Sequence, residues 1–183
     1  MKDFKYNEMM VHVPLCTHKE PNNVLIISSD AAALVTEVQK HIDDISCDVI
    51  SADANALREV KDGAYDVVIS EIDTDAAVLA HINRVLNENG LVVMPIASLQ
   101  EAEDENKTLM SILGKYAKIV MPYQLGNCEV ALLASKEYHP TADIILQRAD
   151  LIDGLEYYNS DVHPAAFAMG NNIRKAYRGI IKN

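Results

Sequence analysis

The sequence predicts an α/β fold in which a mostly parallel sheet of about six strands carries helices on both faces. Short apolar runs alternate with segments of helical period along the first 135 residues. Most of these runs are apolar throughout, which is typical of parallel strands that are buried on both faces. The 183 residues contain no repeat and no linker, so we expect a single domain spanning residues 1–183.

The first helix is expected over residues 3–16, where apolar residues form a wide face and Pro14 lies near the end. A polar turn then leads into a short strand, Val24-Leu-Ile-Ile27. Ser28, Ser29 and Asp30 are helix N-cap types, and the Ala-rich segment 31–41 follows them as a helix. This strand, turn and helix have the outline of a nucleoside cradle, but the turn has none of the glycines that such a cradle normally uses.

The same alternation continues through the middle of the chain. We expect strands at 48–51, 66–70, 91–94 and 117–121, and helices at 54–60, 74–87 and 99–115. Thr74 is placed to cap the helix at 74–87, and Asn89-Gly90 to end it. A last strand at 130–134 follows a short loop, so it should run antiparallel to its neighbour. From Thr141 onward the pattern is helical.

The composition excludes several classes of protein. The formal charge is 16 − 27 = −11, which argues against a nucleic-acid partner because phosphate binding needs a basic face. The charge is compatible with a cationic ligand, although a well-solvated acidic surface is the commoner reason for such a charge. Three scattered cysteines and six histidines show no metal-ligand spacing, so no metal site is expected. No apolar run is long enough to span a membrane and no signal-peptide core is present, so we expect a cytoplasmic protein.

Two blocks at opposite ends of the chain carry a resemblance. Tyr6-Asn-Glu-Met-Met-Val-His-Val-Pro-Leu-Cys-Thr-His18 is similar to the Tyr-Gln-Glu-Met…His-x-Pro-Leu segment of the spermidine synthase (aminopropyltransferase) family. Tyr157-Tyr-Asn-Ser-Asp-Val-His-Pro-Ala-Ala-Phe167 resembles that family's Tyr-Tyr-Asn-x-x-x-His-x-Ala-Ala-Phe. Tyr65-Asp-Val-Val-Ile69 and Pro122-Tyr123 add weaker support. The resemblance covers essentially the whole chain and implies a Rossmann-like, methyltransferase-type sheet.

The resemblance also implies a reaction of polyamine biosynthesis. The family transfers an aminopropyl group from decarboxylated S-adenosylmethionine to a diamine, usually putrescine. This chemistry needs a deprotonated, aligned amine and carboxylates that hold the cationic polyamine. Carried over by position, the catalytic candidates are Glu71, Tyr6 and Tyr123. The candidates for binding the polyamine or the nucleoside are Asn7, Asp30, Asp53 and Asp73.

Each of these candidates also has a structural interpretation. Tyr6 can serve as a core tyrosine, and Glu71 and Asp73 as a solvated acidic loop before a helix N-terminus. Asp30 can stand in for the family's ligand-facing Asp after a one-residue slip, but it is better placed as a helix N-cap. Asp53 is likewise expected to cap the helix at 54–60.

The cofactor side departs from the family pattern at three places. The turn Ser28-Ser-Asp-Ala-Ala-Ala33 replaces the family's Gly-Gly-Gly-Asp-Gly-Gly, and its ligand-facing Asp falls on Ala31. Ser51 replaces the Glu that binds the ribose hydroxyls in the family. About one helix–strand unit, including the Gly-Asp-Gly adenine loop, has no counterpart between Asp53 and the next strand. We therefore keep two hypotheses: an aminopropyltransferase with an altered cofactor site, and a catalytically inactive homologue that binds a partner or a small ligand.

A prediction about assembly follows from the start of the sequence. The small β-domain that precedes Tyr-Gln-Glu-Met in the family is not present before Tyr6. We expect its loss to expose apolar surface on the first helix, at Phe4, Met9 and Val13. Such a surface predicts a homodimer or a complex with a full-length relative.

Overall fold

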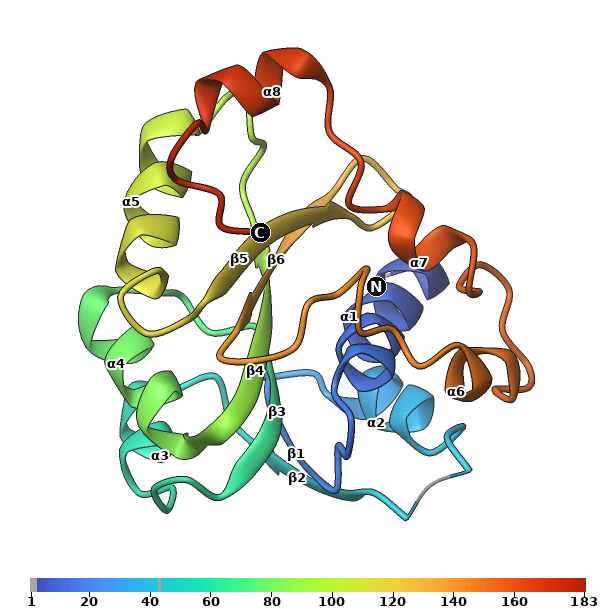
Figure 1. The fold of residues 1–183 in the computed structure, drawn as a ribbon. Helices are drawn as coiled ribbons and strands as arrows, with labels where there is room; N and C mark the ends of the chain where they lie inside the picture. Colours follow the sequence, from blue (N-terminus) through green and yellow to red (C-terminus); the bar gives the residue numbers. More distant parts are fainter. Residues whose placement is uncertain (1–2, 43) are drawn as a thin grey trace.

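A six-stranded sheet forms the middle layer of the computed structural model, which describes residues 3–42 and 44–183 (Figure 1). The strands follow the order β2-β1-β3-β4-β6-β5. β2, β1, β3 and β4 are parallel, and β6 runs antiparallel to both β4 and β5. Their bounds are β1 Asn23–Ile27, β2 Ser46–Ile50, β3 Tyr65–Ser70, β4 Leu86–Ile96, β5 Ile119–Gln124 and β6 Val130–Ser135. The predicted fold class and the antiparallel last strand are confirmed.

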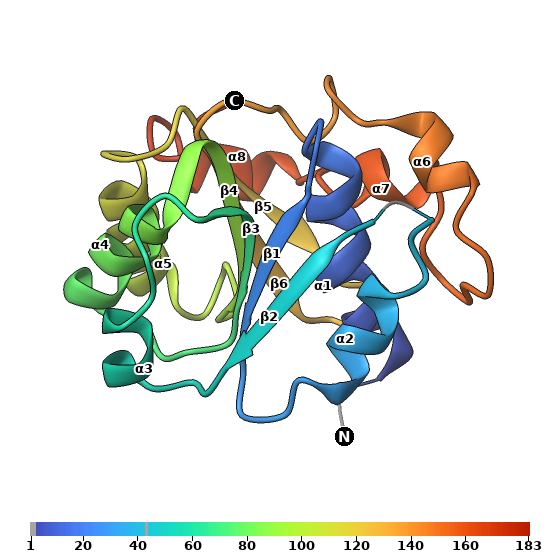
Figure 2. The same ribbon diagram turned by 90° about the horizontal axis from the view of Figure 1, so that it is seen from below.

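Helices cover both faces of the sheet, as Figures 1 and 2 show. One face carries α1 (Phe4–Thr17), α2 (Ala32–Val38), α6 (Leu146–Asp150) and α7 (Val162–Ala165). The other carries α3 (Ala54–Arg58), α4 (Ala76–Val85), α5 (Glu103–Leu113) and α8 (Asn171–Ala176). In the described part of the chain, no helix combines the length and the apolar character that crossing a membrane requires.

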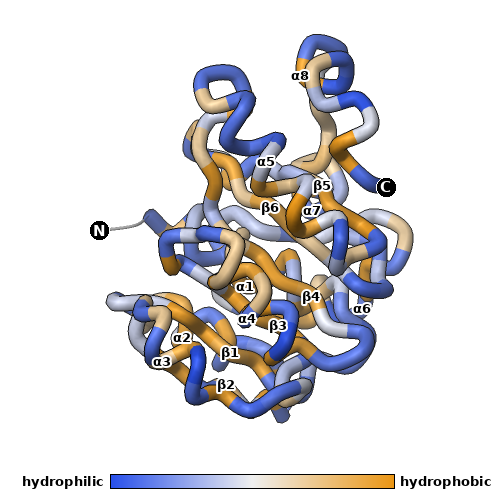
Figure 3. Tube along the Cα trace, turned by 90° about the vertical axis from the view of Figure 1, so that its left-hand side faces the viewer, coloured by the Kyte–Doolittle hydropathy of each residue, from blue (hydrophilic) through white to orange (hydrophobic). Residues whose placement is uncertain are grey.

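Each face of the sheet has its own core, because alternate residues of a strand point to opposite faces. In β1, Val24 and Ile26 pack toward α1, whereas Leu25 and Ile27 pack toward α3 and α4. Figure 3 shows the resulting apolar layer running through the strands, with hydrophilic residues gathered in the surrounding turns. β2 is the exception, since most of its residues are exposed or half-buried at the open edge of the sheet.

The first helix is more deeply buried than its sequence suggests. Every residue of α1 from Tyr6 to Thr17 is buried, and Met9 and Val13 are completely covered. The C-terminal segment contributes to this burial: its apolar residues belong to the same core as α1, and the buried Glu8 carboxylate accepts hydrogen bonds from the backbone N–H groups of residues 156–158. Only Phe4 is exposed, at 43%. The prediction of an exposed apolar face at Met9 and Val13 is therefore wrong. The prediction of a dimer was based on this face and loses that support.

Two predicted helix starts are also wrong. The cap of α2 is Ala31, which makes no side-chain capping bond, and not Asp30. The N–H of Asp30 instead donates to the hydroxyl of Ser28, so the turn is closed one residue earlier. The cap of α4 is Asp75, whose carboxylate accepts the N–H of Val78 at 2.7 Å, and not Thr74.

The predicted end of α4 at Asn89-Gly90 is wrong as well. α4 ends at Val85, and the chain enters β4 at Leu86, which pairs with Tyr65 of β3. The side chain of Asn87 donates to Asp66 at the start of β3, and this contact holds the chain extended. A tertiary pairing has here overridden a local helix-stop signal. The remaining elements were predicted in the correct order and type, with bounds that differ by a few residues.

Candidate functional site

The candidate site lies where β1 and β3 end side by side. Ile27 and Ser70 are paired in the parallel ladder, so the residues that follow them, Ser28 and Glu71, are neighbours. The N–H of Glu71 donates to the carbonyl of Ile27 at 2.8 Å. After β1 the chain turns into α2 on one face of the sheet, and after β3 it turns into α4 on the other. A crevice between strands whose helices depart to opposite faces is the usual ligand site of an open α/β sheet.

Two hydroxyl groups hold the Glu71 carboxylate at this edge of the sheet. The Tyr6 hydroxyl donates to Oε1 at 2.6 Å, and the Ser28 hydroxyl donates to Oε2 at 2.5 Å. Tyr6 is 2% exposed, and burial together with its bond to Glu71 raises the pKa of the phenol far above its ordinary value. Tyr6 is therefore a neutral donor at physiological pH. The half-buried Glu71 is a fixed hydrogen-bond acceptor, as a group that receives an amine must be.

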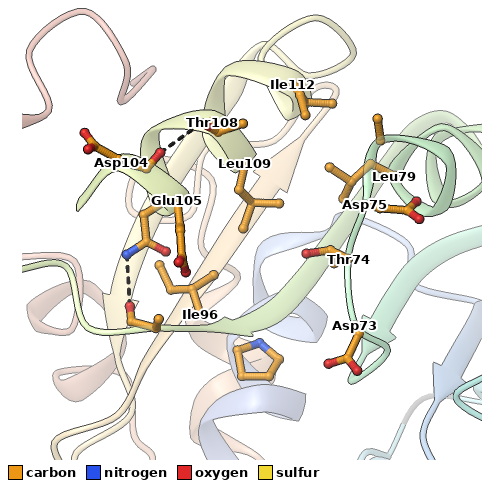
Figure 4. A pocket seen from close by; sticks show the side chains of 14 residues that line it. Asp73, Thr74, Asp75, Leu79, Ile96, Asp104, Glu105, Thr108, Leu109 and Ile112 are labelled. Carbon is orange, nitrogen blue, oxygen red and sulfur yellow. Dashed lines mark hydrogen bonds between the residues drawn. The ribbon is translucent and has the colours of Figure 1, made fainter. Parts of the chain in front are cut away.

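A cavity of about 770 Å³ opens nearby, between the start of α4, the end of β4 and α5 (Figure 4). Asp73 and Asp75 lie on one side of it, and Asp104 and Glu105 on the other. Its apolar wall is formed by Leu79, Pro95, Ile96, Leu109 and Ile112. No lysine or arginine is among its described lining residues. Apolar walls with carboxylates at the rim suit an alkyl chain that carries positive charge.

The cavity does not include the Glu71 carboxylate or the residues that bind it. Neither Tyr6 nor Glu71 lines the cavity, but Asp73, two residues beyond Glu71, does. The short segment 71–75 therefore joins the carboxylate to the cavity along one edge of the sheet. We base the chemical argument on Glu71, because two side-chain hydroxyl groups hold this half-buried carboxylate.

The other predicted residues lie in different surroundings. Asp30 is exposed on the turn after β1, and Asp53 is exposed and caps α3 by accepting the N–H of Ala56 at 3.3 Å. The predicted capping role of Asp53 is thus confirmed. Asn7 is 9% exposed on α1, next to Tyr6 in the chain.

Tyr123 lies in the core. Its side chain is fully buried and stacks on Phe167, with ring centroids 5.0 Å apart. Its hydroxyl lies 3.4 Å from the carbonyl oxygen of Met9, and burial raises the pKa of its phenol. The structure therefore brings Tyr6 and Glu71 into contact, whereas Tyr123 packs beneath α1 and makes no described hydrogen bond to either.

Ser28 is the site residue that sequence reasoning missed. It was interpreted only as part of a capping turn, yet its hydroxyl binds the one carboxylate on which the site is centred. A signal was available in principle: Ser28 and Glu71 each follow the last residue of a buried strand. That signal becomes specific only when the two strands are known to be neighbours.

The two end blocks of the sequence meet in the fold. Besides the contact of Glu8 with residues 156–158, the Tyr158 hydroxyl lies 2.7 Å from Nδ1 of His163. Nε2 of His163 lies 2.9 Å from the carbonyl oxygen of Pro140 and must donate to it, so Nδ1 accepts from Tyr158. These buried contacts hold the C-terminal segment over α1 and thereby fix the position of Tyr6.

Comparison with known proteins agrees with this arrangement. The family model of the spermine/spermidine synthase domain matches residues 3–62. A polyamine aminopropyltransferase of Helicobacter pylori (strain HPAG1) is 23% identical over 206 residues, covering 97% of this chain and 78% of the relative. One from Escherichia coli O1:K1 / APEC is 28% identical over 225 residues, covering 95% and 77%. Over nearly its whole length the chain is similar to polyamine aminopropyltransferases.

Solved structures of the family share the fold. The spermidine synthase of Thermotoga maritima superposes with a TM-score of 0.81 at 23% identity, over 95% of this chain and 74% of that one. A spermidine synthase in complex with the transition-state analogue AdoDATO gives a TM-score of 0.80 at 22% identity, over 95% and 75%. The alignment with the Helicobacter relative spans 206 positions against 183 residues here, so at least 206 − 183 = 23 positions have no counterpart in this chain. This difference agrees with the helix–strand unit that the sequence suggested is absent.

Proposed function

We propose that this chain is an aminopropyltransferase of the spermidine synthase type, which transfers an aminopropyl group to a diamine at Glu71. The observation that carries the proposal is the Tyr6–Glu71 contact at the carboxyl ends of β1 and β3. A fixed carboxylate beside an acidic cavity with an apolar wall suits a diamine, whose ammonium groups need carboxylates and whose methylenes need apolar contact.

The proposed reaction needs little covalent chemistry from the protein. The amine nitrogen attacks the carbon next to the sulfonium of decarboxylated S-adenosylmethionine, a C–N bond forms and the C–S bond breaks. The leaving group is the neutral thioether methylthioadenosine, and the amine gives up a proton. Glu71 would hold and align the amine and accept that proton, while Tyr6 keeps the carboxylate in place.

A second candidate function is amine binding without group transfer. It is favoured by the residues expected on the cofactor side: Asp30 is exposed, with its backbone N–H bound to Ser28, and Asp53 caps a helix. Asp30, after a one-residue slip of the register, and Asp53 were the acids expected to hold the nucleoside. Each lost hydrogen bond to a ligand costs roughly 1 kcal/mol or more, so the loss of both would weaken nucleoside binding by at least tenfold.

One set of measurements separates the two. Calorimetry with putrescine and with methylthioadenosine reports the two halves of the site, and a transfer assay with decarboxylated S-adenosylmethionine reports turnover. Glu71→Gln should weaken putrescine binding by about 10- to 100-fold, because a hydrogen bond to a charged group contributes about 1.5–3 kcal/mol. Glu59→Gln is the matched control, since Glu59 is exposed at the end of α3.

The outcomes are distinct. Product that forms with the wild type and is lost in Glu71→Gln supports transfer. Putrescine binding that depends on Glu71 without any product supports the second candidate. If millimolar putrescine produces no binding heat and no product forms, both proposals are wrong.

A further inference from the structure

The hydroxyl of Ser28 has one proton, and the structure shows where that proton goes. The Ser28 oxygen accepts the N–H of Asp30 at 3.0 Å. Its proton is directed at Glu71 Oε2, 2.5 Å away. The hydroxyl therefore donates one hydrogen bond and accepts another. Together they link the β1–α2 turn to the Glu71 carboxylate at the end of β3.

Glu71 Oε2 is also an oxygen that an incoming amine needs. Each oxygen of the carboxylate already accepts a hydroxyl proton, one from Tyr6 and one from Ser28. An alkylammonium group binds a carboxylate best through short, charge-assisted hydrogen bonds to its oxygens. Such a ligand must share an oxygen with a hydroxyl or displace it.

Of the two hydroxyl groups, that of Ser28 is the one that can yield. The Tyr6 ring belongs to the core packed between α1 and the sheet, and it cannot turn away without disturbing its neighbours. Ser28 has a short side chain with three rotamers. The turn that follows it is exposed at Ser29 and Asp30 and enters α2 without a side-chain cap. Moving the Ser28 hydroxyl thus leaves the core intact.

We propose that Ser28 sets the amine affinity of this site by acting as an internal competitor for Glu71. The inference rests on the proposed function, in that the ligand is the diamine expected at Glu71. In the free protein the Ser28 hydroxyl occupies Oε2, and the amine binds this oxygen in competition with it. Ser28 is then a specificity-determining residue, because only a donor stronger than a neutral hydroxyl can displace it.

The test is calorimetric titration of putrescine into the full chain and into three variants. Ser28→Ala and Ser28→Gly remove the hydroxyl and should tighten putrescine binding about tenfold, because the competing hydrogen bond to a charged group is gone. Ser28→Thr keeps a hydroxyl and should bind like the wild type. Ser29→Ala is the matched control, since it removes an exposed hydroxyl one residue away. Titration with 1,4-butanediol controls for the charge of the ligand and should give no heat in any protein.

Every result decides the proposal. Equal or weaker putrescine binding by Ser28→Ala and Ser28→Gly would overturn it, whereas Glu71-dependent binding by the wild type would leave the proposed function standing. Binding by these two variants but not by the wild type supports the masking role and contradicts the proposed function of the native chain. The absence of binding in all proteins overturns both. Far-ultraviolet circular dichroism of each variant ensures that affinities are compared between folded proteins, and Ser28→Gly serves if Ser28→Ala does not fold.

Discussion

Replacing Glu8 by Gln tests whether one buried carboxylate holds the C-terminal segment on the first helix. Glu8 is 1% exposed, and its oxygens accept three backbone N–H groups: Glu156 at 2.8 Å, Tyr157 at 2.8 Å and Tyr158 at 2.7 Å. A Gln side chain has almost the same shape but only one acceptor oxygen, and its NH₂ group must face one or two of these donors. At best two of the three hydrogen bonds survive, and they are no longer charge-assisted.

The size of the effect follows from that count. The lost hydrogen bond contributes roughly 1.5–3 kcal/mol, and weakening of the two that remain adds about 1–2 kcal/mol. The saved cost of burying a charge offsets part of this, so we expect Glu8→Gln to lower the free energy of unfolding by about 3 kcal/mol. With a urea m-value of about 2 kcal/mol/M, the midpoint should fall by about 1.5 M.

The assay is urea unfolding followed by circular dichroism at 222 nm, since the chain has no tryptophan. Glu156→Gln makes the same chemical change at an exposed side chain of the same segment and should leave the midpoint unchanged. A Glu8→Gln midpoint within experimental error of the wild type would refute the view that this carboxylate anchors the segment. A fall of the same size in Glu156→Gln would show that the effect is not specific to the buried contact.

Two further predictions concern the same half of the molecule. Burial lowers the pKa of His163 from 6.5 to about 4, so the folded state binds fewer protons than the unfolded state between these values. This contribution to stability is complete above pH 6.5 and falls by about 3 kcal/mol as the pH drops to 4. The thermal midpoint of His163→Asn should therefore change less between pH 7 and pH 4.5 than that of the wild type. Equal changes in the two proteins would contradict a lowered pKa of His163. Arg148 donates to the carbonyl groups of Leu15, His18 and Lys19 at the end of α1. Arg148→Met should cost about 2–3 kcal/mol in urea unfolding, because three carbonyl groups lose their charged donor. Arg174→Met, at an exposed position of α8, should cost almost nothing.

Much of the sheet could be predicted from the sequence because its strands are apolar on both faces. The runs at 24–27 and 66–70 needed no tertiary information, and the short loop before Val130 determined the antiparallel direction of β6. Helix limits were less predictable where a distant strand decided them. α4 stops at Val85 because Leu86 pairs with Tyr65, and nothing in the local pattern shows this.

The burial of α1 could not be predicted for a similar reason. A segment about 150 residues later in the chain packs on α1 with apolar side chains such as Ile152 and Phe167, and it donates backbone N–H groups to Glu8. No local pattern in the sequence shows that these distant residues meet. In the site, the resemblance placed Tyr6 and Glu71 among the catalytic candidates, but it did not predict the hydrogen bond between them. The part of Ser28 was not predicted either, because it depends on the adjacency of β1 and β3 and on the rotamer of one hydroxyl.

Much of the two blocks that resemble the spermidine synthase family, residues 6–18 and 157–167, is explained by the fold without any catalytic role. Glu8, Tyr158 and His163 lie in those blocks, and the structure shows all three buried and hydrogen-bonded where the chain ends meet. A chain that lost group transfer but kept this fold would still need them, because each leaves buried polar partners unsatisfied when it is removed. The blocks therefore indicate the fold, and they do not distinguish an active member from an inactive one.

The exposed or half-buried acids behave differently. Asp30 and Asp53 have little to do with the cores of the protein, so the cofactor side could diverge at small cost to stability. Glu71 lies between these extremes: it is half-buried, fixed by Tyr6 and Ser28, and next to an acidic cavity that the fold does not require to be acidic. Glu71 satisfies the buried hydroxyl of the core residue Tyr6, and the segment that begins with Glu71 reaches the acidic cavity at Asp73. For this reason we base the functional argument on Glu71 and the residues around it.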